Sequence, residues 1–183
     1  MKKAIDVAIE KEAYFTNRAD FYDIYLNNSE KSLEDYDKAI SLSPEFKRPL
    51  NNKALLLQDL ERYEEALKIY DDIIEIDSSY WRAYLNRADI YYDLKDYENA
   101  LNDYSKVIEL QPEDPDYLIY RSDCYVALED YDNALIDMSK AIDVAIEKEV
   151  YFTNRADFYD TYLDNSEKSL EDYDKAISLS PEF

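Results

Sequence analysis

The sequence predicts an all-α protein made of a repeated helix–turn–helix unit. The clearest copy covers residues 81–114, 34 residues in which apolar side chains recur at helical spacing. Tyr84, Ala88 and Tyr91 would share one face of a first helix, and residues 100–108 give a second helix the same pattern. Neither helix could bury its apolar face alone, so the unit is expected to pack against neighbouring copies.

The ends of the second helix are marked by residues with strong positional preferences. Asp96 precedes this helix, where its short carboxylate can accept the unpaired N–H groups of the first turn. Pro112 follows the helix and cannot continue it. The chain contains no glycine, which argues against tight hairpins and glycine-rich phosphate loops, because both need a positive φ or a close approach of the backbone.

The composition limits the classes of function. The formal net charge is −22, with 43 acidic and 21 basic residues. Nucleic acids and anionic membranes are therefore not expected as partners, because binding them relies on cationic side chains. The absence of histidine removes the commonest general base and metal ligand, so we expect no catalysis, no metal site and no cofactor.

Three features bear on the compartment. The single cysteine, Cys124, leaves no internal disulfide and fits a reducing compartment, the cytoplasm. Asp6 and Glu10 interrupt the apolar residues of the N-terminus, so we expect no signal peptide. No run of residues approaches the ~18 apolar positions of a membrane span.

The repeated pattern can be followed along the whole chain and predicts one continuous array. A partial unit, the end of a second helix, comes first, and the units are 1–11, 12–46, 47–80, 81–114, 115–148 and 149–183. A small residue recurs in the first helix as Ala19, Ala54, Ala88, Ser122 and Ala156. The second helix has its own small position, occupied by Ser32, Ala66, Ala100, Ala134 and Ser169. Ile146 replaces the terminal proline of the fourth repeat, so that helix is expected to run on or to end loosely near 147–149.

A 34-residue helix–turn–helix with small, aromatic and proline residues at these places resembles the tetratricopeptide repeat. The resemblance covers the whole chain and implies a right-handed superhelical solenoid. It further implies a non-enzymatic scaffold for protein–protein interactions, in which the first helix of each repeat lines a concave groove.

The positions that line the groove in this family carry amides and carboxylates here. The lining comprises Asn17, Asn52, Asn86 and Asn154 with Tyr120 interrupting them, then Asp20, Asp89, Asp123 and Asp157, and also Arg48, Asn51 and Arg82. Side-chain amides can pair with the backbone of an extended peptide, and carboxylates attract Lys or Arg, so we expect an extended, basic segment as the ligand. In the alternative interpretation the same residues cap helices, face solvent or pair within the array, for instance with Arg18, Arg87, Arg121 and Arg155.

A longer duplication lies over the short repeat. Residues 1–46 and 138–183 are identical at 42 of 46 positions and differ at Lys2/Ser139, Ala13/Val150, Ile24/Thr161 and Asn27/Asp164. The apolar residues expected to lie uncovered at the two ends are Ile5 and Ile9, then Leu170, Tyr173 and Ile177. A head-to-tail contact between chains could imitate an internal repeat interface, so a self-assembling structural unit is the second hypothesis.

Overall fold

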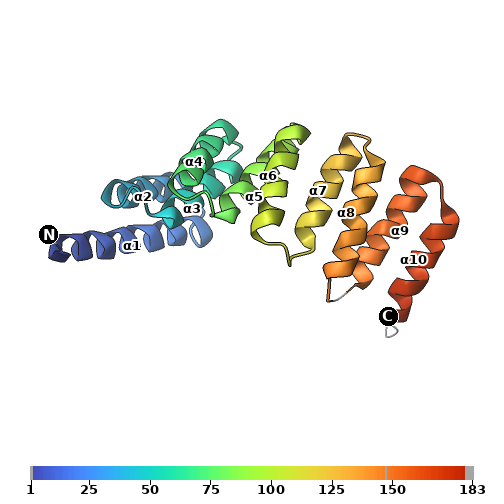
Figure 1. Ribbon diagram of the computed structural model, residues 1–183. Coiled ribbons are helices and arrows are strands. Elements are labelled where there is room, and N and C mark those ends of the chain that lie inside the picture. Colours follow the sequence, from blue (N-terminus) through green and yellow to red (C-terminus); the bar gives the residue numbers. More distant parts are fainter. Residues whose placement is uncertain (1, 147, 180–183) are drawn as a thin grey trace. The chain divides into compact units, whose positions relative to one another are not determined.

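The computed structural model describes residues 2–146 and 148–179. Within these ranges the chain forms ten α-helices and no β-strand, so the predicted all-α fold is confirmed (Figure 1). The first helices of successive pairs begin at or within one residue of 47, 81, 115 and 149, the starts expected from the repeat. The helices are α1 (Lys2–Ile24), α2 (Ser29–Leu42), α3 (Lys47–Asp59), α4 (Tyr63–Ile76), α5 (Trp81–Asp93), α6 (Tyr97–Leu110), α7 (Asp116–Ala127), α8 (Tyr131–Val144), α9 (Glu149–Leu163) and α10 (Ser166–Leu179).

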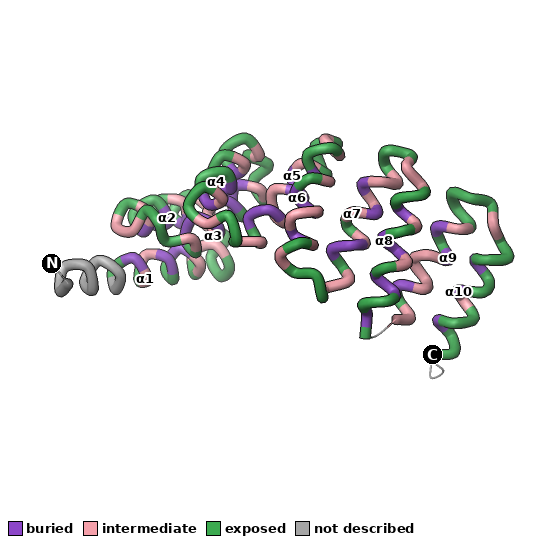
Figure 2. Tube along the Cα trace, viewed as in Figure 1, coloured by how far each residue is buried: buried purple, intermediate pink, exposed green. Residues whose placement is uncertain are grey.

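The chain divides into two compact units, Met1–Ile90 and Tyr91–Phe183, with the division inside α5. In both units the buried positions recur along the helices, while most turn residues are exposed or partly exposed (Figure 2). The core of the first unit contains Leu50, Ala54, Leu57, Ala66, Tyr70, Ile73, Ala83 and Ile90. The second unit has one cluster of Leu118, Ala141, Ile142, Ala145 and Tyr151, and another of Ala134, Met138 and Phe158.

The small residues predicted from the repeat are all buried where helices pack against each other. A side chain no larger than Ala or Ser at these places lets two helices approach closely, while larger neighbours fill the space around them. Ser32 shows the fit directly, because its Oγ donates a hydrogen bond of 2.9 Å to the carbonyl oxygen of Ala19 on the paired helix. None of the described helices combines the length and the hydropathy that a membrane span requires.

The turns use left-handed backbone although the chain has no glycine. Residues with positive φ lie in the turn of every repeat: Asn27, Glu61, Lys95, Glu129 and Asp164. The lack of glycine therefore does not exclude positive φ in this chain. Hydrogen bonds hold these turns, as where the N–H of Asp96 donates to the carbonyl of Tyr91 at 2.8 Å. Asp96 also caps α6 as predicted, accepting from the N–H of Asn99 at 3.4 Å.

One heptapeptide adopts two conformations in the two copies of the long duplication. Residues 6–12 and 143–149 have the same sequence, DVAIEKE. The first copy is helical throughout, so the expected boundary between 1–11 and 12–46 is replaced by one continuous helix, α1. In the second copy α8 ends at Val144, Ala145 is extended, and α9 begins at Glu149. We expected α8 to run on past Ile146 or to end loosely near 147–149, but it ends earlier, at Val144, and Ile146 is 99% exposed.

Packing explains the difference between the two copies. Ala145 is buried in one cluster with Leu118 of α7 and Tyr151 of α9, and this contact fixes the end of α8. The first copy continues directly into the rest of α1, and Ala, Glu, Lys and Ile all favour or tolerate a helix.

Candidate functional site

In the first unit, the groove residues predicted on α1 and α3 bind one another. The guanidinium of Arg48 donates from Nη2 to Oδ1 of Asn17 at 3.0 Å and to Oδ2 of Asp20 at 2.8 Å. Asp20 also accepts from Nδ2 of Asn52 at 3.0 Å and from the hydroxyl of Tyr36 at 2.7 Å. The carboxylate of Asp20 therefore has three hydrogen-bond partners within the protein.

The groove residues on α5 are engaged as well. Nδ2 of Asn86 donates to Oδ1 of Asn51 at 3.2 Å, and Asn51 is buried. The guanidinium of Arg82 lies 4.4 Å from the ring centroid of Trp81. Asp89 also has an interaction partner. In this unit the structure thus supports the alternative interpretation, in which the amides and carboxylates pair within the array.

In the second unit only some of the predicted groove side chains have partners within the protein. Tyr120 packs against Tyr104 and Tyr117, with ring centroids 5.9 and 6.2 Å apart. Asp157 accepts a hydrogen bond from the hydroxyl of Tyr173. The side chains of Asp123 and Asn154 make no hydrogen bond or ion pair with any residue that the structure describes. Partial burial raises the pKa of Asp123 to about 6.

Three arginines at one position of the first helices bind aspartates outside the predicted groove. Each binds an aspartate on the paired second helix: Arg18 with Asp35, Arg121 with Asp137, and Arg155 with Asp172. Nη1 of Arg121 and of Arg155 also reaches a serine on the preceding helix, Ser105 at 3.0 Å and Ser139 at 2.9 Å. Sequence reasoning missed these links, although an aspartate recurs just before Tyr36, Met138 and Tyr173.

The ring of Tyr92 lies near Asp123 in the second unit, and other aromatic rings pack in pairs there. The ring of Tyr92 packs edge-on against Tyr97 at 5.4 Å between centroids. Tyr162 packs against Phe158 at 5.3 Å and against Tyr131 at 5.6 Å. Burial raises the pKa of Tyr92, and the negative charge of Asp123 adds to this effect, so the two side chains lie within electrostatic reach of each other.

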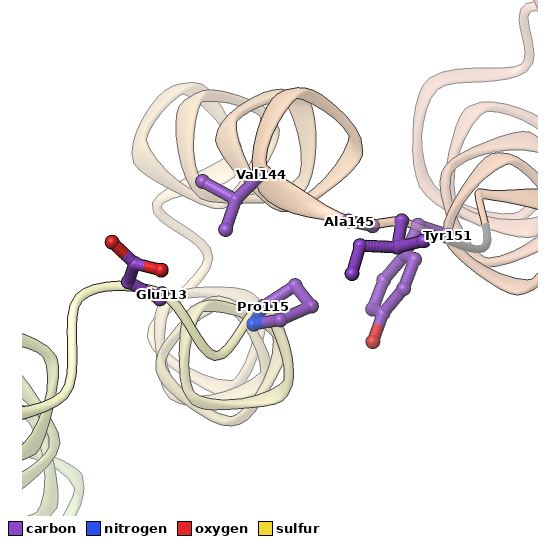
Figure 3. A pocket seen from close by; sticks show the side chains of 6 residues that line it. Glu113, Pro115, Val144, Ala145 and Tyr151 are labelled. Carbon is purple, nitrogen blue, oxygen red and sulfur yellow. The ribbon is translucent and has the colours of Figure 1, made fainter.

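A separate pocket lies at the turn between α8 and α9. It has a volume of about 350 Å³ and is lined by Glu113, Pro115, Val144, Ala145, Ile146 and Tyr151 (Figure 3). The Tyr151 hydroxyl donates to Oδ1 of Asp116 at 2.6 Å, which anchors the start of α9 to the start of α7. None of the predicted groove residues lines this pocket.

The residues predicted to lie uncovered at the ends differ in their exposure. Leu170 and Ile177 are exposed on α10, whereas Tyr173 is partly buried and bonded to Asp157. The side chains of Ile5 and Ile9 lie outside the described part of the structure.

The sequence matches two family models, both described as tetratricopeptide repeat. One matches residues 81–114, and the other matches 13–46, 48–80 and 151–183. No curated protein matches the sequence.

Several solved structures share the fold. "MamA 41-end" from Desulfovibrio magneticus RS-1 has a TM-score of 0.79 and 19% identity, covering 93% of this chain and 96% of its own. YrrB, described as a TPR protein with an unusual peptide-binding site, has a TM-score of 0.71 and 23% identity, covering 99% and 92%. A thermophilic TPR protein from Thermus thermophilus has a TM-score of 0.63 and 17% identity, covering 93% and 92%. At these identities the likeness shows the fold alone.

Proposed function

We propose that this chain, which belongs to the tetratricopeptide repeat family and is built as a protein-interaction scaffold, binds an extended segment that carries Lys or Arg. The role is non-enzymatic, and the ligand lies along the first helices of the repeats. The second unit, with α7 and α9, supplies the main binding groups of this proposal.

The proposal rests on the ion pairs that three arginines make within the protein. The net charge is −22, and Arg18, Arg121 and Arg155 are each held by an aspartate of the paired second helix. These arginines are therefore not available to neutralise the carboxylates of the first helices. An acidic surface favours a basic partner, both in encounter rate and in specificity.

The Asn154 side chain, which has no hydrogen-bond partner among the described residues, also supports the second unit as the binding surface. Asn154 offers one acceptor and two donors, none of them used by a described residue. A side-chain amide of this kind can pair with the backbone of an extended segment, independent of its sequence. YrrB, a structural neighbour, is described as having an unusual peptide-binding site, which is consistent with peptide binding on this fold.

A binding titration tests the proposal. The probes are three 12-residue fluorescent peptides that share a Ser/Asn background and carry four Lys, four norleucine or four Glu residues. We expect the Lys probe to bind at least tenfold more tightly than the norleucine probe and to weaken with added salt, because exposed ion pairs are screened. Equal affinity for the Lys and Glu probes would contradict a basic ligand.

Self-association is a second candidate, favoured by a comparison of α2 with α10. The two helices have the same sequence, SEKSLEDYDKAISL. On α2, Leu33 and Ile40 pack against the core cluster to which α3 contributes. The matching residues of α10, Leu170 and Ile177, are exposed. An α3-like surface of a second copy of this chain would cover them.

Light scattering over a concentration series tests this second candidate. We expect the mean mass to rise with concentration, and the double substitution Leu170→Gln with Ile177→Gln to abolish the rise. Ile136→Gln is the matched control, because Ile136 is an exposed apolar residue on α8. A constant monomeric mass at all concentrations argues against head-to-tail assembly.

A further inference from the structure

The ninth residue of a repeat is an aspartate in every repeat except the second, and its surroundings differ among them. In the first repeat, the carboxylate of Asp20 has three partners: Arg48 at 2.8 Å, Asn52 at 3.0 Å and Tyr36 at 2.7 Å. The aspartates of the third and fifth repeats, Asp89 and Asp157, also have partners within the protein. In the fourth repeat, Asp123 has no partner among the described residues.

The sequence explains why Asp123 lacks partners. The place of Arg48 in the following repeat is taken by Val150, and the place of Tyr36 on the paired helix is taken by Met138. Neither side chain can donate a hydrogen bond. The place of Asn52 is taken by Asn154, which keeps the donor but makes no hydrogen bond with any described residue.

Partial burial makes this lack of partners significant. Asp123 is partly buried on α7, and loss of water around the carboxylate raises its pKa to about 6. A carboxylate that has lost hydration without gaining a partner is unfavourable in the folded protein. A cation supplied from outside would restore the lost interaction.

The Tyr92 ring near the Asp123 carboxylate indicates which cation fits. Tyr92 and Tyr162 are both exposed, and each is fixed by another ring: Tyr92 by Tyr97 at 5.4 Å, and Tyr162 by Phe158 at 5.3 Å. Tyr92 lies within electrostatic reach of both Asp123 and Tyr162. The faces of tyrosine rings attract ammonium and guanidinium groups, and their apolar surface suits the methylene stem of Lys or Arg.

We propose that Asp123, with the ring of Tyr92 near it, forms a subsite for one Lys or Arg side chain of the bound segment. This inference rests on the proposed function, because it identifies where a basic segment places one of its cations. The subsite is specific to the fourth repeat, since the equivalent carboxylates in the first, third and fifth repeats already have partners within the protein.

A single-cation probe tests the subsite. The probes are 11-residue Ser/Asn peptides with a central Lys, Arg or norleucine, titrated against the full chain by fluorescence anisotropy. We expect the Lys and Arg probes to bind at least tenfold more tightly than the norleucine probe. Asp123→Asn should remove most of this preference. Val150→Arg should do the same, because the new guanidinium would occupy the carboxylate as Arg48 occupies Asp20.

Asp132→Asn is the control, because it removes one exposed carboxylate on α8 that is not among the predicted groove residues, and it should leave the preference unchanged. An undiminished Lys preference in Asp123→Asn overturns the subsite while leaving the basic groove intact. Absence of any difference between Lys and norleucine in the wild-type chain, with the four-Lys probe of the previous section still bound, also overturns the subsite alone. Failure of both Lys probes overturns the proposed function as well.

Discussion

Replacing Arg121 by alanine is expected to lower the free energy of unfolding by about 3–4 kcal/mol. The guanidinium donates from Nε to Oδ2 of Asp137 at 2.7 Å and from Nη2 to Oδ1 at 2.8 Å, a bidentate pair. Its Nη1 also reaches Ser105, so one side chain joins α6, α7 and α8. Because the Asp137 side chain is only 2% exposed, the substitution would leave its carboxylate buried without a counter-charge.

The same position in the first repeat provides the control. Arg18 binds Asp35, but its side chain is 54% exposed, and Asp35 also accepts from Nζ of Lys38 at 3.0 Å. Arg18→Ala should therefore lower stability by well under half of the loss caused by Arg121→Ala, because water screens the pair and Lys38 remains as a counter-charge. Urea denaturation followed by circular dichroism measures both values. Equal losses for the two variants would show that the difference in exposure and in counter-charge is not the cause.

A double substitution separates the charge from the packing. Arg121→Met with Asp137→Leu should recover most of the loss caused by Arg121→Ala, because a buried ion pair is often replaceable by apolar side chains of similar volume. If the double variant is as unstable as Arg121→Ala, the contribution of Arg121 lies in its link to Ser105 instead.

The repeat, the helices and the buried small residues could be predicted from the sequence because each depends on spacing within about 34 residues. Side-chain pairing could not, because it depends on which residues of different helices meet. The repeat pattern places Asn17 and Asp20 in two columns facing a ligand, yet Arg48, 28 residues beyond Asp20, binds both. The pairing of Arg121 with Asp137 on the second helix could not be predicted from the sequence for the same reason.

Residues 6–12 and 143–149 mark another limit of local sequence. The two heptapeptides are identical, so no rule based on propensity or on capping residues can assign a helix to one and a turn to the other. The burial of Ala145 between Leu118 and Tyr151 decides the second case. The lack of proline at Ile146 predicts a weak helix end, but the end is fixed by packing on the preceding residue.

Replacing Asp123 by asparagine is expected to raise the free energy of unfolding at pH 7 by about 1–2 kcal/mol. Burial raises the pKa of the folded carboxyl to about 6, above its ordinary value near 4. The folded state therefore binds more protons than the unfolded state between these two pH values. The ionised carboxylate opposes folding above pH 6, and this penalty disappears below pH 4. A rise of the pKa from near 4 to about 6 corresponds to at most about 3 kcal/mol, and partial exposure of the side chain to water lowers this to about 1–2 kcal/mol.

The difference in the free energy of unfolding between Asp123→Asn and the wild type should thus be greatest above pH 6 and vanish as the pH falls to 4. Thermal or urea unfolding across this pH range measures it. Asp20→Asn, at the same place in its repeat, should act in the opposite direction at pH 7, because it removes the ion pair with Arg48 and weakens the contacts with Asn52 and Tyr36. Two aspartates at one repeat position would then have opposite effects on stability, set by the residues at three neighbouring places. If both substitutions changed stability in the same direction, the presence of Val150 and Met138 in place of hydrogen-bond donors would not explain the behaviour of Asp123.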